Sequence, residues 1–104
     1  MIDKGYTEQK IISVLQTVYD PEIPVDIYEL GLIYNIKLED NGDTEITMTL
    51  TSPACPVAES LPGEVRQKIK EIEEVNEVNI NLVWEPPWNK DMMSEEAKLN
   101  LGFL

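Results

Sequence analysis

Residues 32–50 read LIYNIKLEDNGDTEITMTL, and this stretch decides the fold. Apolar and polar residues alternate in both of its halves, which is the period of a half-buried strand. Residues 40–43 separate the halves and favour a tight turn, because Asn and Gly accept positive φ. We therefore predict a β-hairpin whose first strand covers 32–39. The inward-facing sets are Leu32, Tyr34, Ile36 and Leu38, then Ile46, Met48 and Leu50, while Glu45, Thr47 and Thr49 are expected to face outward.

Helical patterns flank the hairpin on both sides. Residues 7–19 carry one apolar stripe at three- and four-residue spacing, with Thr7 as the expected N-cap. Apolar residues at helical spacing return over 57–72, where Pro62 and Gly63 predict a kink or a restart near Ser60. Alternation resumes over 77–84 and predicts a third strand. Its inward set is Val78, Ile80, Leu82 and Trp84.

The order helix–strand–strand–helix–strand predicts an α/β fold of the α+β two-layer kind. Two helices would cover one face of a small three-stranded mixed sheet, whose strand order stays open. A length of 104 residues fits a single domain, 1–104. The tail 85–104 is too apolar to stay free, so we expect it to pack on the domain. The alternative is that it binds a partner or forms a dimer.

The net charge of the chain limits the classes of partner that it is expected to bind. Eight basic and 20 acidic residues give a net charge of −12. Binding to nucleic acid needs a basic face, and anionic membranes attract basic segments, so neither partner is expected. The charge fits a basic protein partner, or simply a well-solvated surface.

The chain has one cysteine and no histidine. A single cysteine forms no intramolecular disulfide, which suits a reducing compartment. No apolar run is long enough for a secretion signal or a membrane span, so we expect a cytoplasmic protein. The missing histidine removes the commonest general base, and no other nucleophile–base set is present. We therefore expect no enzymatic turnover.

Cys55 is the candidate chemical centre. It follows the second strand, and Pro56 suits the first position of the next helix. A cysteine at a helix N-terminus is stabilised as the thiolate, the form that binds iron or a cluster. The alternative is that Cys55 is a small buried hydrophobe, the commonest state of a lone cysteine.

The loop 20–31 is the second candidate, because it carries Asp20, Glu22 and Asp26. If it folds next to Cys55, its carboxylates supply oxygen ligands or raise the pKa of the thiol by repulsion. A solvated loop is the alternative. Asp26 is also a suitable cap for a helical turn over 26–30 that Gly31 would close.

Four stretches resemble one known family. Residues 20–33, DPEIPVDIYELGLI, resemble the signature loop of the metal–sulfur cluster assembly family, which includes SufT-like and PaaD-like proteins and the eukaryotic cytosolic iron–sulfur targeting factor. Residues 51–56, TSPACP, resemble its second signature, the strand end with the reactive cysteine. WEPPW at 84–88 and MSEEAK at 93–98 look like the tail of SufT-type members.

The resemblance implies a fold similar to the C-terminal domain of NifU-type scaffolds and a role in maturing iron–sulfur proteins. By position, it implies that Cys55 is the functional thiol, with Asp20, Glu22 and Asp26 in the adjoining loop. The implied partners are the iron–sulfur assembly machinery and its client apoproteins. PaaD-like proteins carry further cysteines in a C-terminal region that this chain lacks, which counts against a PaaD role.

One thiol per chain limits how a cluster is held, since a cluster normally takes about four ligands, mostly thiolates. We therefore expect iron or a cluster to be bound transiently, through a homodimer, an outside thiol such as glutathione, or a partner's cysteines. Two other functions stay open: an accessory maturation subunit of a multicomponent oxygenase, and a thiol-based redox protein.

Overall fold

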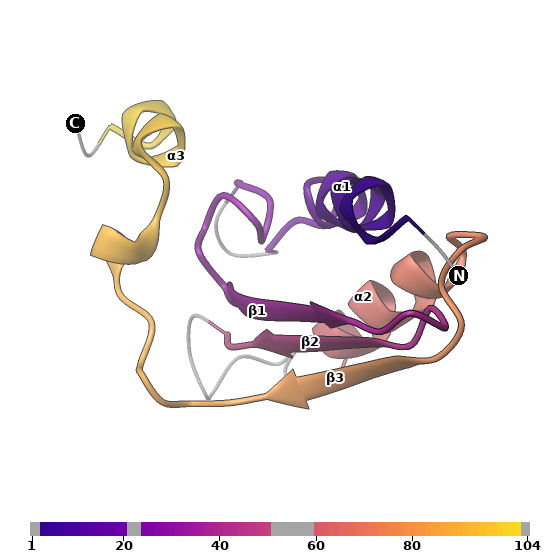
Figure 1. Cartoon of the computed structure of the whole chain (residues 1–104). Helices are drawn as coiled ribbons and strands as arrows, with labels where there is room; N and C mark the ends of the chain where they lie inside the picture. Colours follow the sequence, from indigo (N-terminus) through magenta and orange to yellow (C-terminus); the bar gives the residue numbers. More distant parts are fainter. Residues whose placement is uncertain (1–2, 21–23, 51–59, 103–104) are drawn as a thin grey trace.

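The computed structural model describes residues 3–20, 24–50 and 60–102 (Figure 1). The order helix–strand–strand–helix–strand is confirmed, and the tail adds a short 3₁₀ helix and one further α-helix. The elements are α1 (Lys4–Leu15), β1 (Ile33–Leu38), β2 (Thr44–Met48), α2 (Ser60–Lys70), β3 (Val78–Leu82), the 3₁₀ helix Lys90–Met92, and α3 (Glu95–Asn100).

The sheet has the order β1-β2-β3, which the sequence left open. β2 pairs antiparallel with β1 and parallel with β3, so the expected mixed sheet is confirmed. Helix α2 packs against β3 and α1, and α1 also contacts β1 (Figure 1). The apolar side chains between the helices and the sheet form the core. Its fully buried members include Ile11, Leu15, Ile46, Met48, Val65 and Ile69.

The hairpin turn forms as predicted. The Glu39 backbone N–H donates to the Asp43 carbonyl at 2.8 Å, and Gly42 has a φ of +93°. A Cβ on Gly42 would lie 2.4 Å from the Glu74 carbonyl oxygen, so both the conformation and the space require glycine there.

A β-bulge changes the predicted alternation in β1. Ile33 pairs with Met48 and Asn35 with Thr47, which leaves Tyr34 as the extra residue. The bulge interrupts the predicted alternation at Ile33, which is also partly buried. From Tyr34 onward the prediction is confirmed, because Tyr34, Ile36 and Leu38 are partly buried and Asn35 and Lys37 are exposed. Thr49 was expected to face outward into solvent, but it is only 1% exposed.

Tyr34 connects Thr49 with the segment that follows β3. The Tyr34 hydroxyl hydrogen-bonds with the Thr49 side chain and donates to the Pro86 carbonyl at 2.7 Å. The segment after β3 therefore runs beside this end of the sheet. Trp84 was expected on the inward side, but it follows the end of β3 and is 40% exposed.

Helix α1 begins and ends earlier than predicted. Its N-cap is Asp3, whose Oδ1 accepts a hydrogen bond from the Tyr6 N–H at 3.1 Å. Thr7 lies inside the helix and is fully buried. The helix ends at Leu15 because Val18 is used elsewhere: its carbonyl accepts from the Ile27 N–H at 2.8 Å.

Helix α2 is described from Ser60, with Pro62 and Gly63 in its first turn, where a missing N–H is tolerated. The expected helical residues before Ser60 lie outside the described part of the chain. Within the ranges that the structure describes, no helix is both long enough and apolar enough to cross a bilayer.

Candidate functional site

The acidic loop is tied closed at its base. Tyr19 and Asp26 form an isolated antiparallel bridge, with the Asp20 N–H 3.4 Å from the Val25 carbonyl. Asp20 is buried at this base, with 4% of its surface exposed. The predicted solvated loop is therefore wrong for Asp20, because backbone pairing draws it into the protein. Glu22, the third predicted carboxylate, lies outside the described residues.

The predicted turn over 26–30 is present. The Asp26 Oδ2 accepts a hydrogen bond from the Glu29 N–H at 3.0 Å, and the Leu30 N–H donates to the Asp26 carbonyl at 3.0 Å. Gly31 closes the turn with a φ of +81°. Asp26 thus caps the turn, as its position in the sequence indicated.

Partial burial raises the pKa of the Asp26 carboxyl. Loss of solvation is the main cause, the hydrogen bond from the Glu29 N–H opposes it, and the Glu29 charge adds to it. A carboxylate held at some cost as an anion gains from a nearby cation. A positively charged partner beside Asp26 would offset this cost.

The turn lies against the strand end that leads to Cys55. The Thr49 N–H donates to the Leu32 carbonyl at 2.9 Å, and the Val83 N–H donates to the Met48 carbonyl at 2.8 Å. Leu50 is buried in the core directly after these contacts. Cys55 lies five positions further along, outside the described residues. The structure thus brings the acidic turn to the end of β2, and the position of the sulfur itself stays a prediction.

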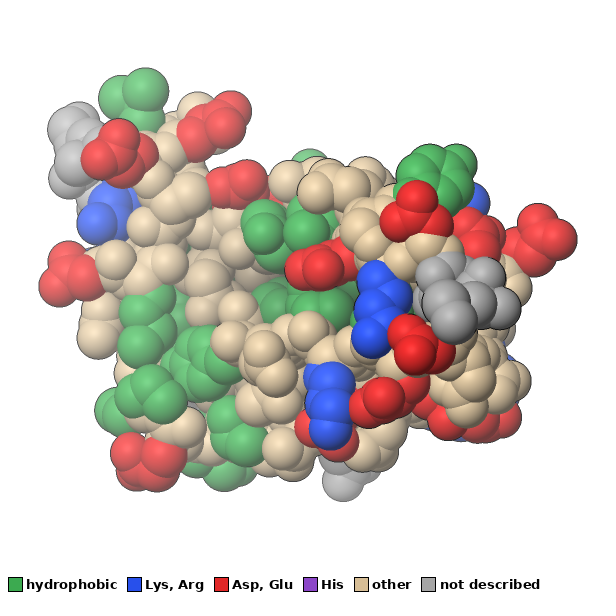
Figure 2. All heavy atoms as spheres, viewed as in Figure 1, with side chains coloured by type: hydrophobic (Ala, Val, Ile, Leu, Met, Phe, Trp, Pro, Cys, Tyr) green, Lys and Arg blue, Asp and Glu red, His purple; other side chains and the backbone are tan. Residues whose placement is uncertain are grey.

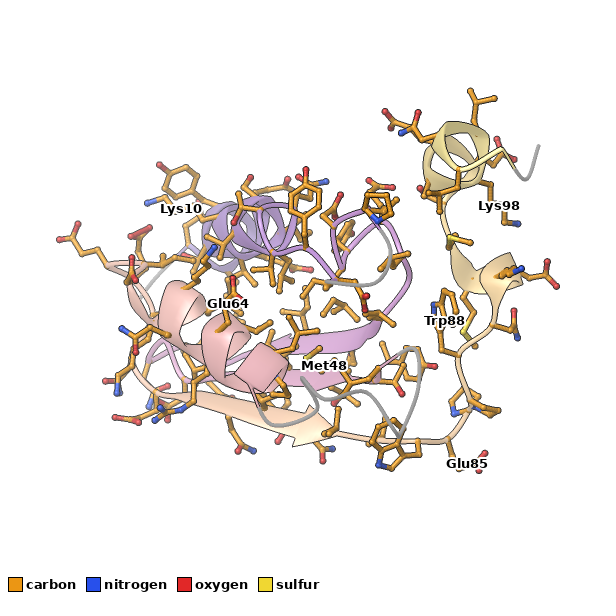
Figure 3. All side chains as sticks on the ribbon, turned by 180° about the vertical axis from the view of Figure 1, so that it is seen from behind. Lys10, Met48, Glu64, Glu85, Trp88 and Lys98 are labelled. Carbon is orange, nitrogen blue, oxygen red and sulfur yellow. The ribbon has the colours of Figure 1, made fainter. Side chains whose placement is uncertain are left out.

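The tail contacts the acidic turn through two hydrogen bonds that the sequence did not predict. The Trp88 indole Nε1–H donates to the Leu30 carbonyl at 2.7 Å, and Figure 3 shows Trp88 on the side of the tail that faces the domain. The Ser94 N–H donates to the Glu29 carbonyl at 2.9 Å. Met93 and Ala97 are buried. The described tail therefore folds back on the turn, and the apolar residues in it were the available signal.

Gly31 lies in close contact with the backbone of the tail. A Cβ on Gly31 would lie 2.2 Å from the Met92 carbonyl oxygen. The residue thus needs both a positive φ and the absence of a side chain. This glycine fixes the distance at which the tail packs on the acidic turn.

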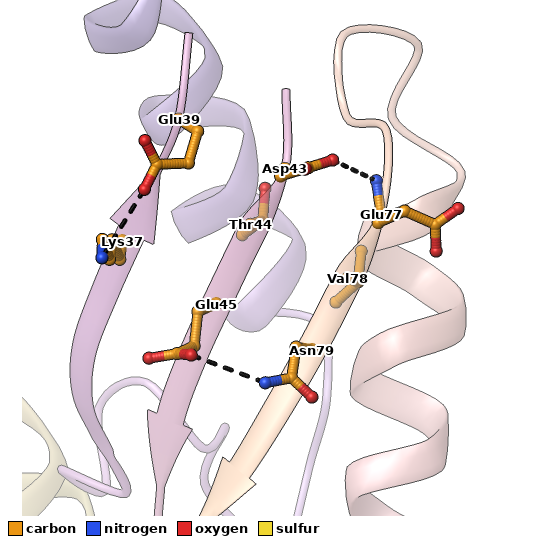
Figure 4. Close-up of a pocket in the computed structure, with 8 residues that line it drawn as sticks. All are labelled: Lys37, Glu39, Asp43, Thr44, Glu45, Glu77, Val78 and Asn79. Carbon is orange, nitrogen blue, oxygen red and sulfur yellow. Dashed lines mark hydrogen bonds and ion pairs between the residues drawn. The ribbon is translucent and has the colours of Figure 1, made fainter. Parts of the chain in front are cut away.

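Two hollows in the surface are alternatives to the acidic turn as a functional site. The larger, of about 440 Å³, lies on the sheet face and is lined mainly by charged and polar residues (Figure 4). Its groups already pair with one another: Lys37 with Glu39 at 3.6 Å, and Asn79 with Glu45 at 3.5 Å. The second, of about 290 Å³, lies between the turn and α3, with Asp26, Glu29 and Glu96 in its wall. Among the described side chains, no group of three or more Cys, Asp or Glu is arranged to hold a metal ion.

Residues 8–82 match the sequence pattern of the iron–sulfur cluster assembly protein family. The chain belongs to this family. It is 55% identical over 98 residues to an Fe-S protein maturation auxiliary factor from Porphyromonas gingivalis, covering 94% of this chain and 93% of that protein. It is 43% identical to the Fe-S protein maturation auxiliary factor YitW from Bacillus subtilis, covering 91% and 93%. A crystal structure of a domain of unknown function, DUF59, from Bacillus anthracis aligns with a TM-score of 0.88 and 42% identity, covering 96% and 95%.

These findings confirm the resemblance seen in the sequence and the α+β fold.

Proposed function

We propose that this chain is an auxiliary maturation factor for iron–sulfur proteins and that Cys55 is its functional thiol. The family and the maturation factors related to the chain support the role. The observation that supports the site is the packing of the acidic turn against the end of β2, through the hydrogen bond from Thr49 to Leu32. Cys55 follows Thr49 by six positions in the sequence, and its place beside that turn is part of the proposal.

Iron or a cluster is cargo in this proposal, and the factor has no turnover of its own. One thiolate supplies about a quarter of the usual ligand set of a cluster. The remaining ligands come from outside the chain: a second copy, a small thiol such as glutathione, or cysteines of the donor or the client. Binding through one ligand is weak, which suits a step in which the cluster is passed on. The partners are the assembly machinery and client apoproteins, met in the cytoplasm.

The carboxylates of the turn would act on the partner and on the thiol. Asp26 and Glu29 place negative charge beside the strand end, which attracts a basic surface and disfavours a free thiolate. A bound iron ion reverses the second effect because its positive charge stabilises both the thiolate and the carboxylates. Cys55 would thus ionise mainly when iron arrives.

The test is complementation in cells that lack the gene. Cys55→Ser is expected to fold and accumulate like the wild type, because serine is well accepted at a helix entry, and to leave client iron–sulfur enzymes inactive. Glu71→Gln, at an exposed position outside the signature stretches, is the control and should restore activity. Full client activity with Cys55→Ser at normal abundance would exclude Cys55 as the functional thiol, and loss of the folded protein would indicate a structural role instead.

A thiol-based redox protein is the alternative from another class. The absence of a second cysteine for resolution disfavours it. Thiol titration and peroxide kinetics on the purified protein separate the two: a low thiol pKa with fast oxidation would favour the redox function.

A further inference from the structure

The outer edge of β1 carries backbone groups without partners. In the hairpin, the Glu39 N–H points to Asp43, and Lys37 lies opposite Glu45. Hydrogen-bonding direction alternates along an antiparallel pair, so the intervening Ile36 and Leu38 direct their N–H and C=O groups away from β2. The Thr44 N–H, opposite Leu38, correspondingly points away from β1 and donates to Glu77. Within the described ranges, nothing hydrogen-bonds to the outward groups of Ile36 and Leu38.

A groove with both polar and apolar surface follows this edge. Its volume is about 240 Å³, and it lies between β1, α1 and Tyr28. Figure 2 shows hydrophobic side chains at the surface between α1 and β1, with an acidic side chain at the margin. Four consecutive residues of β1 line the groove, so it runs along the strand. The lining residues are Glu8, Ile12, Tyr28, Ile33, Tyr34, Asn35 and Ile36.

The opposite edge of the sheet is protected differently. On β3, the Arg66 Nε–H donates to the outward carbonyl of Val78 at 3.2 Å. Natural proteins cover or charge their sheet edges to prevent unwanted pairing. The edge of β1 lacks such a cap among the described residues, and a groove that includes Ile12, Tyr28 and Glu8 flanks it.

We propose that the edge of β1 docks an extended segment of a partner protein, which adds to the sheet as a fourth strand. Pairing with Ile36 and Leu38 supplies backbone hydrogen bonds, and alternate side chains of the segment lie along the groove beside Ile12 and Tyr28. Among the described lining residues Glu8 is the only charged one, so the segment would place a Lys or Arg beside it. A second copy is a poorer occupant, because each chain carries a net charge of −12.

This inference uses the proposed function only for the partner's role in maturation, and its test does not involve Cys55. The probe is an eight-residue peptide with Val at alternate positions, Thr between them and Lys at both ends. In an NMR titration of the whole chain, the Ile36 and Leu38 amides should shift, and their hydrogen exchange should slow about tenfold or more at saturation. Cys55→Ser should bind the peptide equally well.

Two N-methylated versions of the peptide give the sharpest control. One is methylated on the odd-numbered amides and the other on the even-numbered amides. Only one set faces β1 in an added strand, so one version should bind about tenfold more weakly and the other should bind normally. Equal binding by both, or equal loss in both, would overturn the proposal.

Matched proline variants locate the site on the protein. Ile36→Pro removes an outward N–H of β1, and Ile80→Pro removes an outward N–H at the other edge without touching the groove. Ile36→Pro should weaken binding about tenfold, Ile80→Pro should not, and Glu8→Lys should weaken it severalfold. Should a proline variant fail to fold, the methylated peptides still decide. The chain without peptide should be a monomer in sedimentation. A dimer, together with slow hydrogen exchange at Ile36, would show that a second copy occupies this edge and would overturn the proposal of a different partner protein.

Discussion

Replacing Gly31 with alanine tests how tightly the tail is fitted to the acidic turn. The new Cβ would lie 2.2 Å from the Met92 carbonyl oxygen, which is backbone and not a flexible side chain. The φ of +81° adds a conformational cost of about 1–2 kcal/mol for a residue with a Cβ. Overpacking at a site of this kind costs about 1–3 kcal/mol. Gly31→Ala should therefore lower the free energy of unfolding by about 2–5 kcal/mol.

Gly102→Ala is the matched control. Gly102 has the same φ of +81°, but a Cβ there would meet nothing within 4 Å. It should cost at most about 1–2 kcal/mol, the conformational part alone. Urea unfolding followed by circular dichroism gives both values, and a red shift of tryptophan emission in folded Gly31→Ala would report that Trp88 has left the turn. Equal destabilisation by the two variants would refute the close fit.

Three further predictions concern stability. Thr7→Val should raise the free energy of unfolding by about 1 kcal/mol, because the buried Thr7 hydroxyl has no hydrogen-bond partner among the described residues. A lower melting temperature for the variant than for the wild type would show that the hydroxyl is hydrogen-bonded. Trp88→Phe should cost about 1 kcal/mol or more through the lost bond to Leu30, and Trp84→Phe much less; equal costs would contradict the tail contact. Asp26 binds its proton more tightly in the folded state than in the unfolded state, so its contribution to stability should fall as the pH rises from about 4 through the raised pKa. Asp26→Asn, compared with the wild type by urea unfolding across that pH range, should remove this decline. The same pH dependence in both proteins would show that the pKa of Asp26 is not raised.

The sequence predicted the parts of the fold that depend on local pattern. The hairpin, the third strand and the turn capped by Asp26 follow from alternation and turn chemistry over a few residues. The errors lie where distant segments meet. Thr49 is buried at an end of the sheet where Tyr34 hydrogen-bonds with both Thr49 and the Pro86 carbonyl of the tail. No local period reports contacts of this kind.

The same division applies to the candidate site. The motif at 20–33 indicated the family, and Asp26 was recognised as a cap from its position before the turn. The contacts of Trp88 and Ser94 with the turn were not foreseen, because their partners are the carbonyl groups of Leu30 and Glu29. Backbone groups are present at every residue, so a sequence does not show which of them a distant side chain or amide will find.

The central claim is that Cys55 contributes one ligand to a cluster that the chain does not hold alone, and anaerobic reconstitution tests it most directly. Wild-type and Cys55→Ser proteins are incubated with iron and sulfide, with and without glutathione, and iron is counted after desalting. We predict far less than one cluster per chain without glutathione, a visible cluster band when glutathione is added to the wild type, and no band with Cys55→Ser. A full cluster on the wild-type monomer alone, or the same band with Cys55→Ser, would contradict the account.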